Sequence, residues 1–192
     1  MARSKRDELI QKATDIFYRR GFQATGMDTL VVEAGISKTS IYKHFKTKDD
    51  LIVATLRLRD EFLRGWLFRR MAELASTPRD QLIAMFDALD EWFSEPDFHG
   101  CMFAKACSEF QDPDHPINRE ATAHVARLSA QLAEIADRAG LPNPNDIARR
   151  LSLLKEGAVV MATMGHDSRP ALEAKAIALG ILREAEAGRT PV

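Results

Sequence analysis

Six side chains able to donate hydrogen bonds lie close together in the N-terminal quarter of this 192-residue chain. They fall within seven consecutive positions, and none of those positions is acidic: Lys38, Thr39, Ser40, Tyr42, Lys43 and His44. Ammonium, hydroxyl and imidazole groups of this kind bind phosphate oxygens and the edges of nucleic-acid bases. Without further context, the same pattern also fits a helical hairpin with a solvated polar face. The interpretation therefore depends on the elements that would position these side chains.

A second group of chemically active side chains occupies residues 98–116. Its members include two histidines, two cysteines and three acids: His99, Cys101, Cys107, Glu109, Asp112, Asp114 and His115. Their spacing matches no zinc pattern, so we expect no metal and no cofactor. An acid–base site built on His99, Glu109 and His115 would lack both a nucleophile motif and a phosphate-binding loop, so we do not expect an enzyme.

The two cysteines leave one alternative open. If they lie six residues apart on one helix, they are about 9 Å apart along its axis and cannot bridge without unwinding it. Each is by default a small buried hydrophobe. Sensing of oxidants or electrophiles by Cys101 or Cys107 remains the alternative.

The polar segment is preceded by strong signals for a helix-turn-helix. Residues 28–34 predict a short helix, 35–37 a tight turn, and 38–45 a second helix. Gly35 can adopt the left-handed conformation that ends a helix, and Ser37 is a good N-cap for the next one. A helix-turn-helix presents its second helix to the DNA major groove.

The flanking sequence extends this pattern. An amphipathic helix is expected over 3–22, with Gly21 as a plausible stop. Thr25 begins a capping-box signature for the helix after it, and Thr47 begins another for a long helix from Lys48 to about Leu74. The order is helix, short helix, tight turn, short polar helix, long helix.

Composition supports a helical protein with one basic end. Residues 1–48 carry ten Lys and Arg against five acids, a formal charge of +5, so the remainder must carry −6 to reach the total of −1. Such an asymmetry suits a protein that touches DNA at one end. We expect no signal peptide and no membrane contact, and two cysteines suit a reducing cytoplasm.

After residue 74 the sequence predicts five more helices and no strand, so the fold class is all-α. Proline, glycine and cap residues delimit the helices, which are expected over 78–94, 101–110, 116–139, 144–164 and 171–187.

The first 60 or so residues resemble the DNA-binding domain of the TetR (tetracycline repressor) family of bacterial regulators. The resemblance rests on Ala13, Phe17, Gly21-Phe22, Thr25, Met27, Ala34-Gly35-Ile36-Ser37, Ile41-Tyr42-Lys43-His44-Phe45, Lys48 and Leu51. It implies a DNA-binding domain over 1–47 and an effector-binding and dimerisation domain over 48–192. It also implies a ligand-responsive regulator, by default a repressor, that binds a palindromic double-stranded DNA operator as a homodimer and leaves it when a small molecule binds.

The resemblance assigns operator contacts by position. Lys38, Thr39 and Ser40 are expected at base edges, Tyr42 and His44 at phosphates, and Lys43 at either. Thr25 could also reach a phosphate. Lys48 lies at the start of the long helix, and a helix N-terminus with a lysine beside it is a natural phosphate site. A helical scaffold that does not bind DNA is the rival class, and it predicts no salt-dependent binding to duplexes.

For the C-terminal body we expect a self-pairing surface on the last two helices, although an ordinary intramolecular core is the alternative. The expected interface residues are Ile147, Leu151, Leu154, Ala158, Met161, Ala162, Leu172, Ala176 and Leu179. Candidates for the pocket of an unknown small-molecule effector are Trp66, Phe86, Trp92, Phe93, Phe98, Met102, Phe103, Cys107, Phe110 and Met161. Aromatic residues at helical spacing are more often core than pocket.

Overall fold

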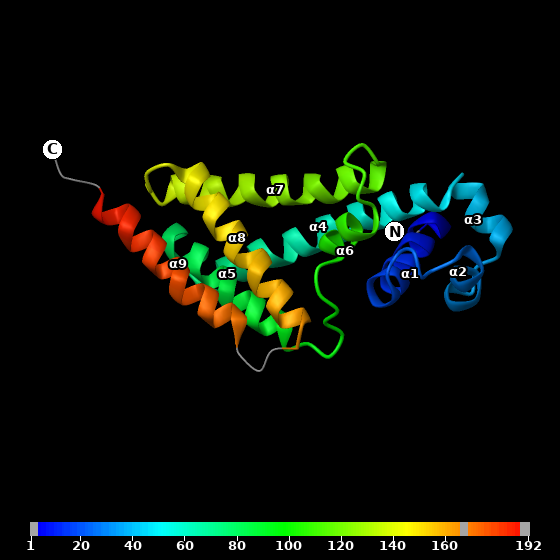
Figure 1. Ribbon diagram of the computed structural model, residues 1–192, viewed down its shortest axis with the longest axis horizontal. Coiled ribbons are helices and arrows are strands. Elements are labelled where there is room, and N and C mark those ends of the chain that lie inside the picture. Colours follow the sequence, from blue (N-terminus) through cyan, green and yellow to red (C-terminus); the bar gives the residue numbers. More distant parts are fainter. Residues whose placement is uncertain (1–3, 166–168, 189–192) are drawn as a thin grey trace. The chain divides into compact units, whose positions relative to one another are not determined.

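The computed structural model describes residues 4–165 and 169–188. Within these ranges the chain forms nine α-helices and no β-strand, so the all-α prediction is confirmed (Figure 1). The helices are α1 (Lys5–Arg20), α2 (Met27–Ala34), α3 (Lys38–His44), α4 (Lys48–Leu74), α5 (Pro78–Phe93), α6 (Met102–Glu109), α7 (Pro116–Arg138), α8 (Pro144–Thr163) and α9 (Pro170–Ala187). None of the helices described is both long enough and apolar enough to cross a membrane.

The contacts divide the chain into two compact units. Unit 1 comprises Met1–Leu63 with Cys101–His124, and unit 2 comprises Arg64–Gly100 with Val125–Val192. This division by packing differs from the expected functional domains 1–47 and 48–192. The reason is that α4 and α7 each contribute residues to both units, while α6 packs with the N-terminal helices.

In unit 1, α1 packs against α2, and α2 packs against α3. Helix α1 starts behind a capping box in which Ser4 and Asp7 bond each other's backbone N–H groups. The expected start at Arg3 lies outside the described residues. The helix ends at Arg20 instead of Phe22, because Gly21 has a φ of 84° and its N–H bonds the carbonyl of Phe17. Phe22 then turns into the core, where it is fully buried.

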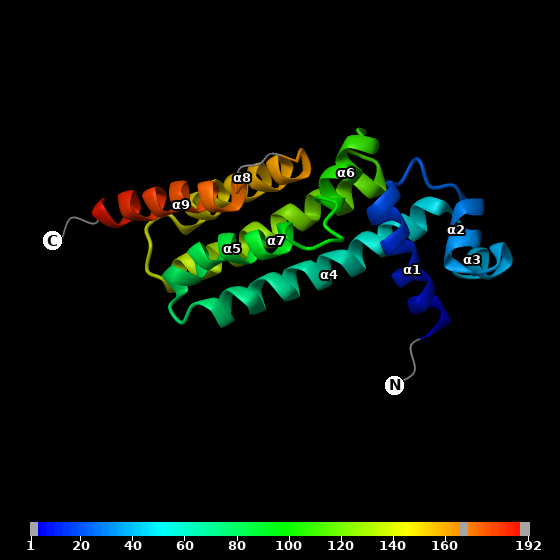
Figure 2. The same ribbon diagram turned by 90° about the horizontal axis from the view of Figure 1, so that it is seen from below.

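In unit 2, α8 and α9 pack side by side, and both contact α5 (Figure 2). The inner face of α9 presents Ala171, Ala174, Ala178 and Leu182. Such small side chains let the helix axes approach closely. Ion pairs lie at the rim of this packing, including Lys175 with Asp87 at 2.6 Å.

The ends of the body helices follow their caps to within a residue or two. Thr77 caps α5 by accepting the N–H of Asp80. One expectation was wrong in detail, because Cys101 is the N-cap of α6 and not part of the helix. Its buried Sγ accepts the N–H of Ala104 at 3.4 Å. The thiol is thus held at the N-terminus of α6.

Candidate DNA-binding interface

The turn between α2 and α3 has the geometry that the sequence predicts. Gly35 takes the left-handed conformation, with φ 63° and ψ 33°, and ends α2. Ser37 caps α3 by accepting the N–H of Ser40 at 3.2 Å. Leu30 and Ile41 are buried, so they anchor the two helices in the core of unit 1.

The donor side chains of α3 lie outside that core. Lys38, Thr39, Tyr42 and Lys43 are exposed, with Tyr42 at 47%. Ser40 and His44 are half-buried. The exposed surface of α3 is therefore rich in donors and free of acids, as a surface that meets DNA should be.

One lysine of this surface has an acidic partner on the neighbouring helix. The Nζ of Lys38 donates to Asp28 Oδ1 at 3.0 Å, and both side chains are exposed. The hydrogen bond raises the pKa of Lys38 above its ordinary value. Asp28 thus positions the ammonium at the N-terminal end of α3.

The start of α4 also carries donors. Thr47 and Asp50 form the expected capping box, with reciprocal bonds of 3.0 and 3.1 Å to each other's backbone N–H groups. Lys48 is half-buried beside this cap, and burial lowers its pKa.

Three charged side chains bond backbone groups at the ends of α1 and α2. Lys12 donates to the carbonyl of Ala34, the last residue of α2, at 3.0 Å. Lys105 donates to the carbonyl of Tyr18 near the end of α1 at 3.0 Å. The Glu109 carboxylate accepts the N–H groups of Phe22, at 3.0 Å to Oε2, and of Gln23. We call the contacts of Glu109 with Phe22 and Gln23 the Glu109 clamp.

The clamp is one feature that sequence reasoning missed. Its partners lie 86 and 87 residues apart in the chain, so no local pattern links them. The structure also shows why Gly21 is needed. In addition to its positive φ, a Cβ at this position would lie 2.9 Å from Glu109 Oε1.

The expected role of Thr25 as a cap was wrong. The N-cap of α2 is Gly26, with no side-chain bond to the helix. Thr25 is fully buried, and its hydroxyl donates to the carbonyl of Gly21 at 2.7 Å. Since that hydroxyl is already used to close the turn after α1, we omit Thr25 from the surface that we propose for DNA.

The expected effector residues do not form one cluster. Trp66, Trp92, Phe93 and Phe98 pack together in unit 2, with ring centroids 5.0 to 6.4 Å apart. We call these four residues the aromatic cluster. Phe86 is fully buried core in the same unit, while Met161 lies 38% exposed on α8.

The remaining candidates belong to unit 1 and have other partners. Phe103 stacks on His124 at 3.7 Å, and Phe110 packs against Phe22 and His115. Met102 is buried and Cys107 is half-buried. These four belong to unit 1, whereas the aromatic cluster belongs to unit 2.

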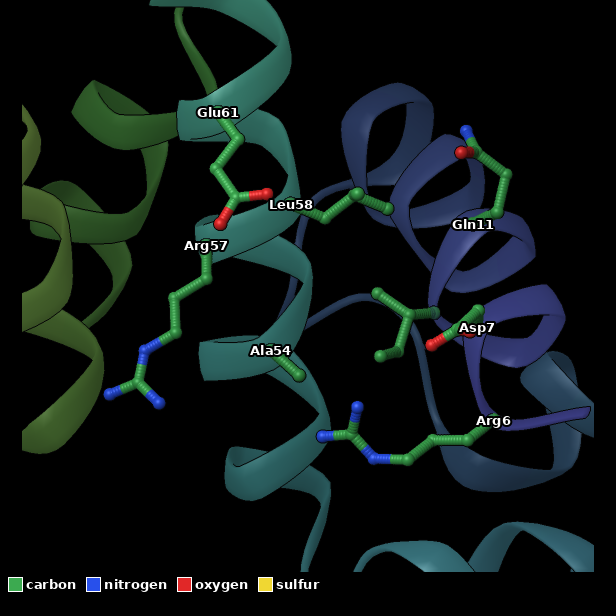
Figure 3. A pocket seen from close by; sticks show the side chains of 8 residues that line it. Arg6, Asp7, Gln11, Ala54, Arg57, Leu58 and Glu61 are labelled. Atoms are coloured by element: carbon green, nitrogen blue, oxygen red, sulfur yellow. The ribbon is translucent and has the colours of Figure 1, made fainter. Parts of the chain in front are cut away.

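Unit 1 contains a cleft of about 270 Å³ between α1 and α4 (Figure 3). None of the expected effector residues lines it. Its charged side chains have partners in unit 1: Arg57 binds Glu120 at 2.8 Å, and the guanidinium of Arg6 lies 5.0 Å from the centre of the Phe45 ring. We assign no ligand to this cleft. Among the described residues, no group of three or more His, Cys, Asp or Glu side chains could hold a metal ion.

Half of the α8 residues that we expected to pair between subunits belong to the core. Ile147, Leu151 and Ala158 are at most 4% exposed because they pack within unit 2. Leu154, Ala162, Leu172 and Leu179 lie half-buried at the edges, and Met161 and Ala176 are exposed. The three buried residues therefore belong to the intramolecular core and not to a surface between subunits.

The opposite side of the same two helices carries an exposed apolar stripe. We define the α8–α9 stripe as Leu153, Gly157, Val160, Met161, Met164, Ala176, Ile177 and Gly180, all of which are exposed. Leu153 and Met164 are each 72% exposed, and Ile177 is 55% exposed. Solvent-exposed apolar side chains in a continuous row typically mark an interaction surface.

Comparison with known proteins agrees with this architecture. Residues 9–55 match the model of the family described as "Bacterial regulatory proteins, tetR family". The HTH-type transcriptional regulator YjdC of Escherichia coli is 21% identical over 179 residues, 93% of this chain and 94% of that protein. The HTH-type transcriptional repressor KstR2 of Mycolicibacterium smegmatis is 39% identical over 88 residues, 44% of this chain and 41% of that protein.

A solved structure extends the likeness to the whole fold. The TetR-family transcriptional regulator SCO4454 from Streptomyces coelicolor superposes with a TM-score of 0.85 at 28% identity, covering 94% of this chain and 89% of that one. The helix-turn-helix geometry, the matched segment and the shared fold lead to one conclusion: residues 9–55 form a DNA-binding domain of the kind found in the tetR family of bacterial regulatory proteins, and the whole chain has the fold of a TetR-family transcriptional regulator.

Proposed function

We propose that this protein is a ligand-responsive repressor that binds a palindromic operator as a homodimer. The observation that carries the proposal is the exposed face of α3, which presents donors and no acid. This helix follows a turn that Ser37 caps. In this proposal the α3 helix of each protomer enters a major groove and reads one half-site.

The proposed roles of the residues in α3 and at the start of α4 follow from their positions and exposure. Lys38, Thr39 and Ser40, at the N-terminal end of α3, would reach base edges, while Tyr42 and His44 would meet phosphates and Lys43 either. Lys48 and the capped start of α4 would bind a further phosphate, since free N–H groups and the helix dipole favour an anion there.

The second half-site requires a second copy of the chain. We propose that the α8–α9 stripe pairs with the same stripe of a partner subunit, as an isologous interface requires. The stripe suits this role because Gly157, Ala176 and Gly180 let backbones approach while Leu153, Val160 and Ile177 supply apolar area. Edge residues such as Leu154, Leu172 and Leu179 would extend it.

Repression is supported by the similarity to KstR2, whose description names it a transcriptional repressor. For the effector we propose a small molecule held within residues 48–192, with the aromatic cluster as part of its site. Such a ligand releases DNA only to the extent that it prefers the non-binding conformation.

The test is a selection of purified protein on genomic duplex fragments, followed by fluorescence anisotropy of the winners at two salt concentrations. The expected result is a short palindrome bound by two chains, with affinity that falls steeply with salt. A matched variant, Lys43→Ala with Tyr42→Ala, should lose binding while keeping its helical circular dichroism. Weak binding without a shared motif, from protein shown by native mass spectrometry to carry no ligand, would contradict the proposal.

A further inference from the structure

The inner face of α8 carries a lysine where an apolar residue would be expected. The buried positions of this helix recur at 147–148, 151–152, 155 and 158–159, one turn apart. Lys155 lies in the middle of this face and is 1% exposed. Its position places the whole side chain in the interior of unit 2, on the side away from the α8–α9 stripe.

The ammonium of Lys155 is poorly compensated for so buried a charge. It can donate three hydrogen bonds, yet among the described residues its one acceptor is Glu156 Oε1, at 2.6 Å. Glu156 is itself 29% exposed at the side chain. Removing an ammonium from water is costly unless its donors are satisfied, so a further acceptor would stabilise this group.

A hydroxyl with the same deficit lies one turn earlier. Ser152 is 7% exposed, and its Oγ has no hydrogen-bond partner among the residues that the structure describes. Residues three apart on a helix share a face, so Ser152 and Lys155 lie one turn apart on the buried face of α8. Buried polar atoms are nearly always bonded, and an exception asks for an explanation such as a missing ligand.

These two groups are complementary to a carboxylate. An ammonium and a hydroxyl can together donate to both oxygens of one carboxylate, and the ammonium supplies a charge-assisted bond. Neither group would favour a cation.

The neighbourhood further along α8 suits an apolar body. Val159 is buried one turn after Lys155, and the exposed Thr163 follows after another turn, where its hydroxyl donates to the carbonyl of Val159. Thr163 lies directly against Gly100, since a Cβ there would come within 2.5 Å of its Oγ1. Gly100 follows Phe98 of the aromatic cluster closely in the chain. The distance along the helix axis from Lys155 to Thr163 is about 12 Å, comparable to a chain of eight to ten carbons.

We propose that Lys155 and Ser152 bind the carboxylate of the effector, an apolar monocarboxylic acid whose body extends along α8 toward the aromatic cluster. This rests on the proposed function, which places an effector in the same body. It adds the chemical class of the ligand and the two residues that select it.

The experiment uses the full-length protein and three pairs of probes that differ in head group: decanoate with 1-decanol, 4-phenylbutyrate with 4-phenylbutanol, and 1-naphthaleneacetate with 1-naphthaleneethanol. Isothermal titration calorimetry and thermal melting are measured for each pair. At least one acid should bind while its alcohol binds about tenfold more weakly or not at all.

Variants assign that binding to the site. Lys155→Met should weaken the acid by about tenfold or more. The variant should stay folded because the carboxylate that it leaves without a partner, that of Glu156, is 29% exposed at the side chain and can be hydrated. Ser152→Ala, which removes a neutral donor, should weaken it by about threefold. Lys175→Met is the matched control, since it removes a lysine of unit 2 that is ion-paired with Asp87 at the rim, and it should leave binding unchanged.

The proposal is overturned if none of the three acids binds better than its alcohol. It is equally overturned if an acid binds but Lys155→Met and Ser152→Ala bind it as the parent does. The operator selection is run on the same preparation. Recovery of a palindrome without acid binding would support the proposed repressor function and contradict the proposed carboxylate site. Acid binding without a palindrome would contradict the proposed repressor function.

Discussion

The two compact units hold their helices together by different means. In unit 1, charged side chains reach backbone atoms at helix ends: Lys12 at the end of α2, and Lys105 and Glu109 around the end of α1. In unit 2, small side chains of α9 pack closely, and charged pairs such as Lys175 with Asp87 lie at the rim of this packing. The first arrangement sets the orientation of a few elements through directional bonds, whereas the second buries area with little directional demand.

The contrast extends to the surfaces that each unit exposes. Unit 1 presents the donors of α3, which should bind less tightly as salt rises, and unit 2 presents the α8–α9 stripe, whose association should depend little on salt. Removal of a positive charge should therefore weaken DNA binding by unit 1. Insertion of a charge into the α8–α9 stripe should weaken association through unit 2.

The largest effect is expected from a charge in the α8–α9 stripe. Leu153→Glu should give a monomer, because the carboxylate would have to be buried against a partner subunit. Loss of the paired half-sites should weaken operator binding by about 100-fold or more. Sedimentation velocity and anisotropy would measure the two effects. Leu74→Glu, at an exposed leucine outside the stripe, is the control. If the Leu153→Glu variant were still a dimer, the α8–α9 stripe would not be the interface.

The next effect concerns the Glu109 clamp. Glu109→Ala leaves the N–H groups of Phe22 and Gln23 without their acceptor, which should cost about 1–3 kcal/mol in the free energy of unfolding. Urea denaturation gives the value. Glu109→Gln keeps an acceptor but loses the charge, so it should fall between the parent and the alanine variant. Equal stabilities of all three would show that the clamp contributes nothing.

A comparable loss, confined to DNA binding, is expected at Lys38. Lys38→Ala should weaken operator binding by about 1–3 kcal/mol and relax the preference at one base pair, with no change in folding stability. Asp28→Ala, which frees the same ammonium, should leave the affinity for the operator unchanged or increase it. Binding assays on operators mutated one base pair at a time would resolve both. A uniform loss across all operators would instead make Lys38 a phosphate contact.

The smallest effect is expected at Lys48. Lys48→Ala should weaken binding to specific and non-specific duplexes alike and reduce the slope of log K against log salt by about one. Anisotropy across a salt series measures the slope. If the slope stays unchanged, Lys48 serves only the packing at the start of α4.

The sequence was sufficient wherever structure is decided within a few residues. The Gly35 turn, the Ser37 cap and the Thr47–Asp50 box depend on neighbours in the chain, and all three were predicted. The helical period of α8 was equally local.

What failed depends on distant neighbours. Which side of α8 faces inward is decided by α5 and α9, so Ile147, Leu151 and Ala158 were assigned to the wrong interface. Thr25 was taken for a cap because its partner, the carbonyl of Gly21, precedes the signature in the chain. The Glu109 clamp has no local signal at all.

The clamp also bears on how this regulator could be rebuilt. The simplest design for a chimaeric regulator joins residues 1–47 of one chain to the C-terminal domain of another. Here such a graft would transfer α3 but leave behind Glu109, the acceptor for the N–H groups of Phe22 and Gln23. A transplantable module should therefore carry residues 101–124 together with 1–63, even though the two pieces are far apart in the gene.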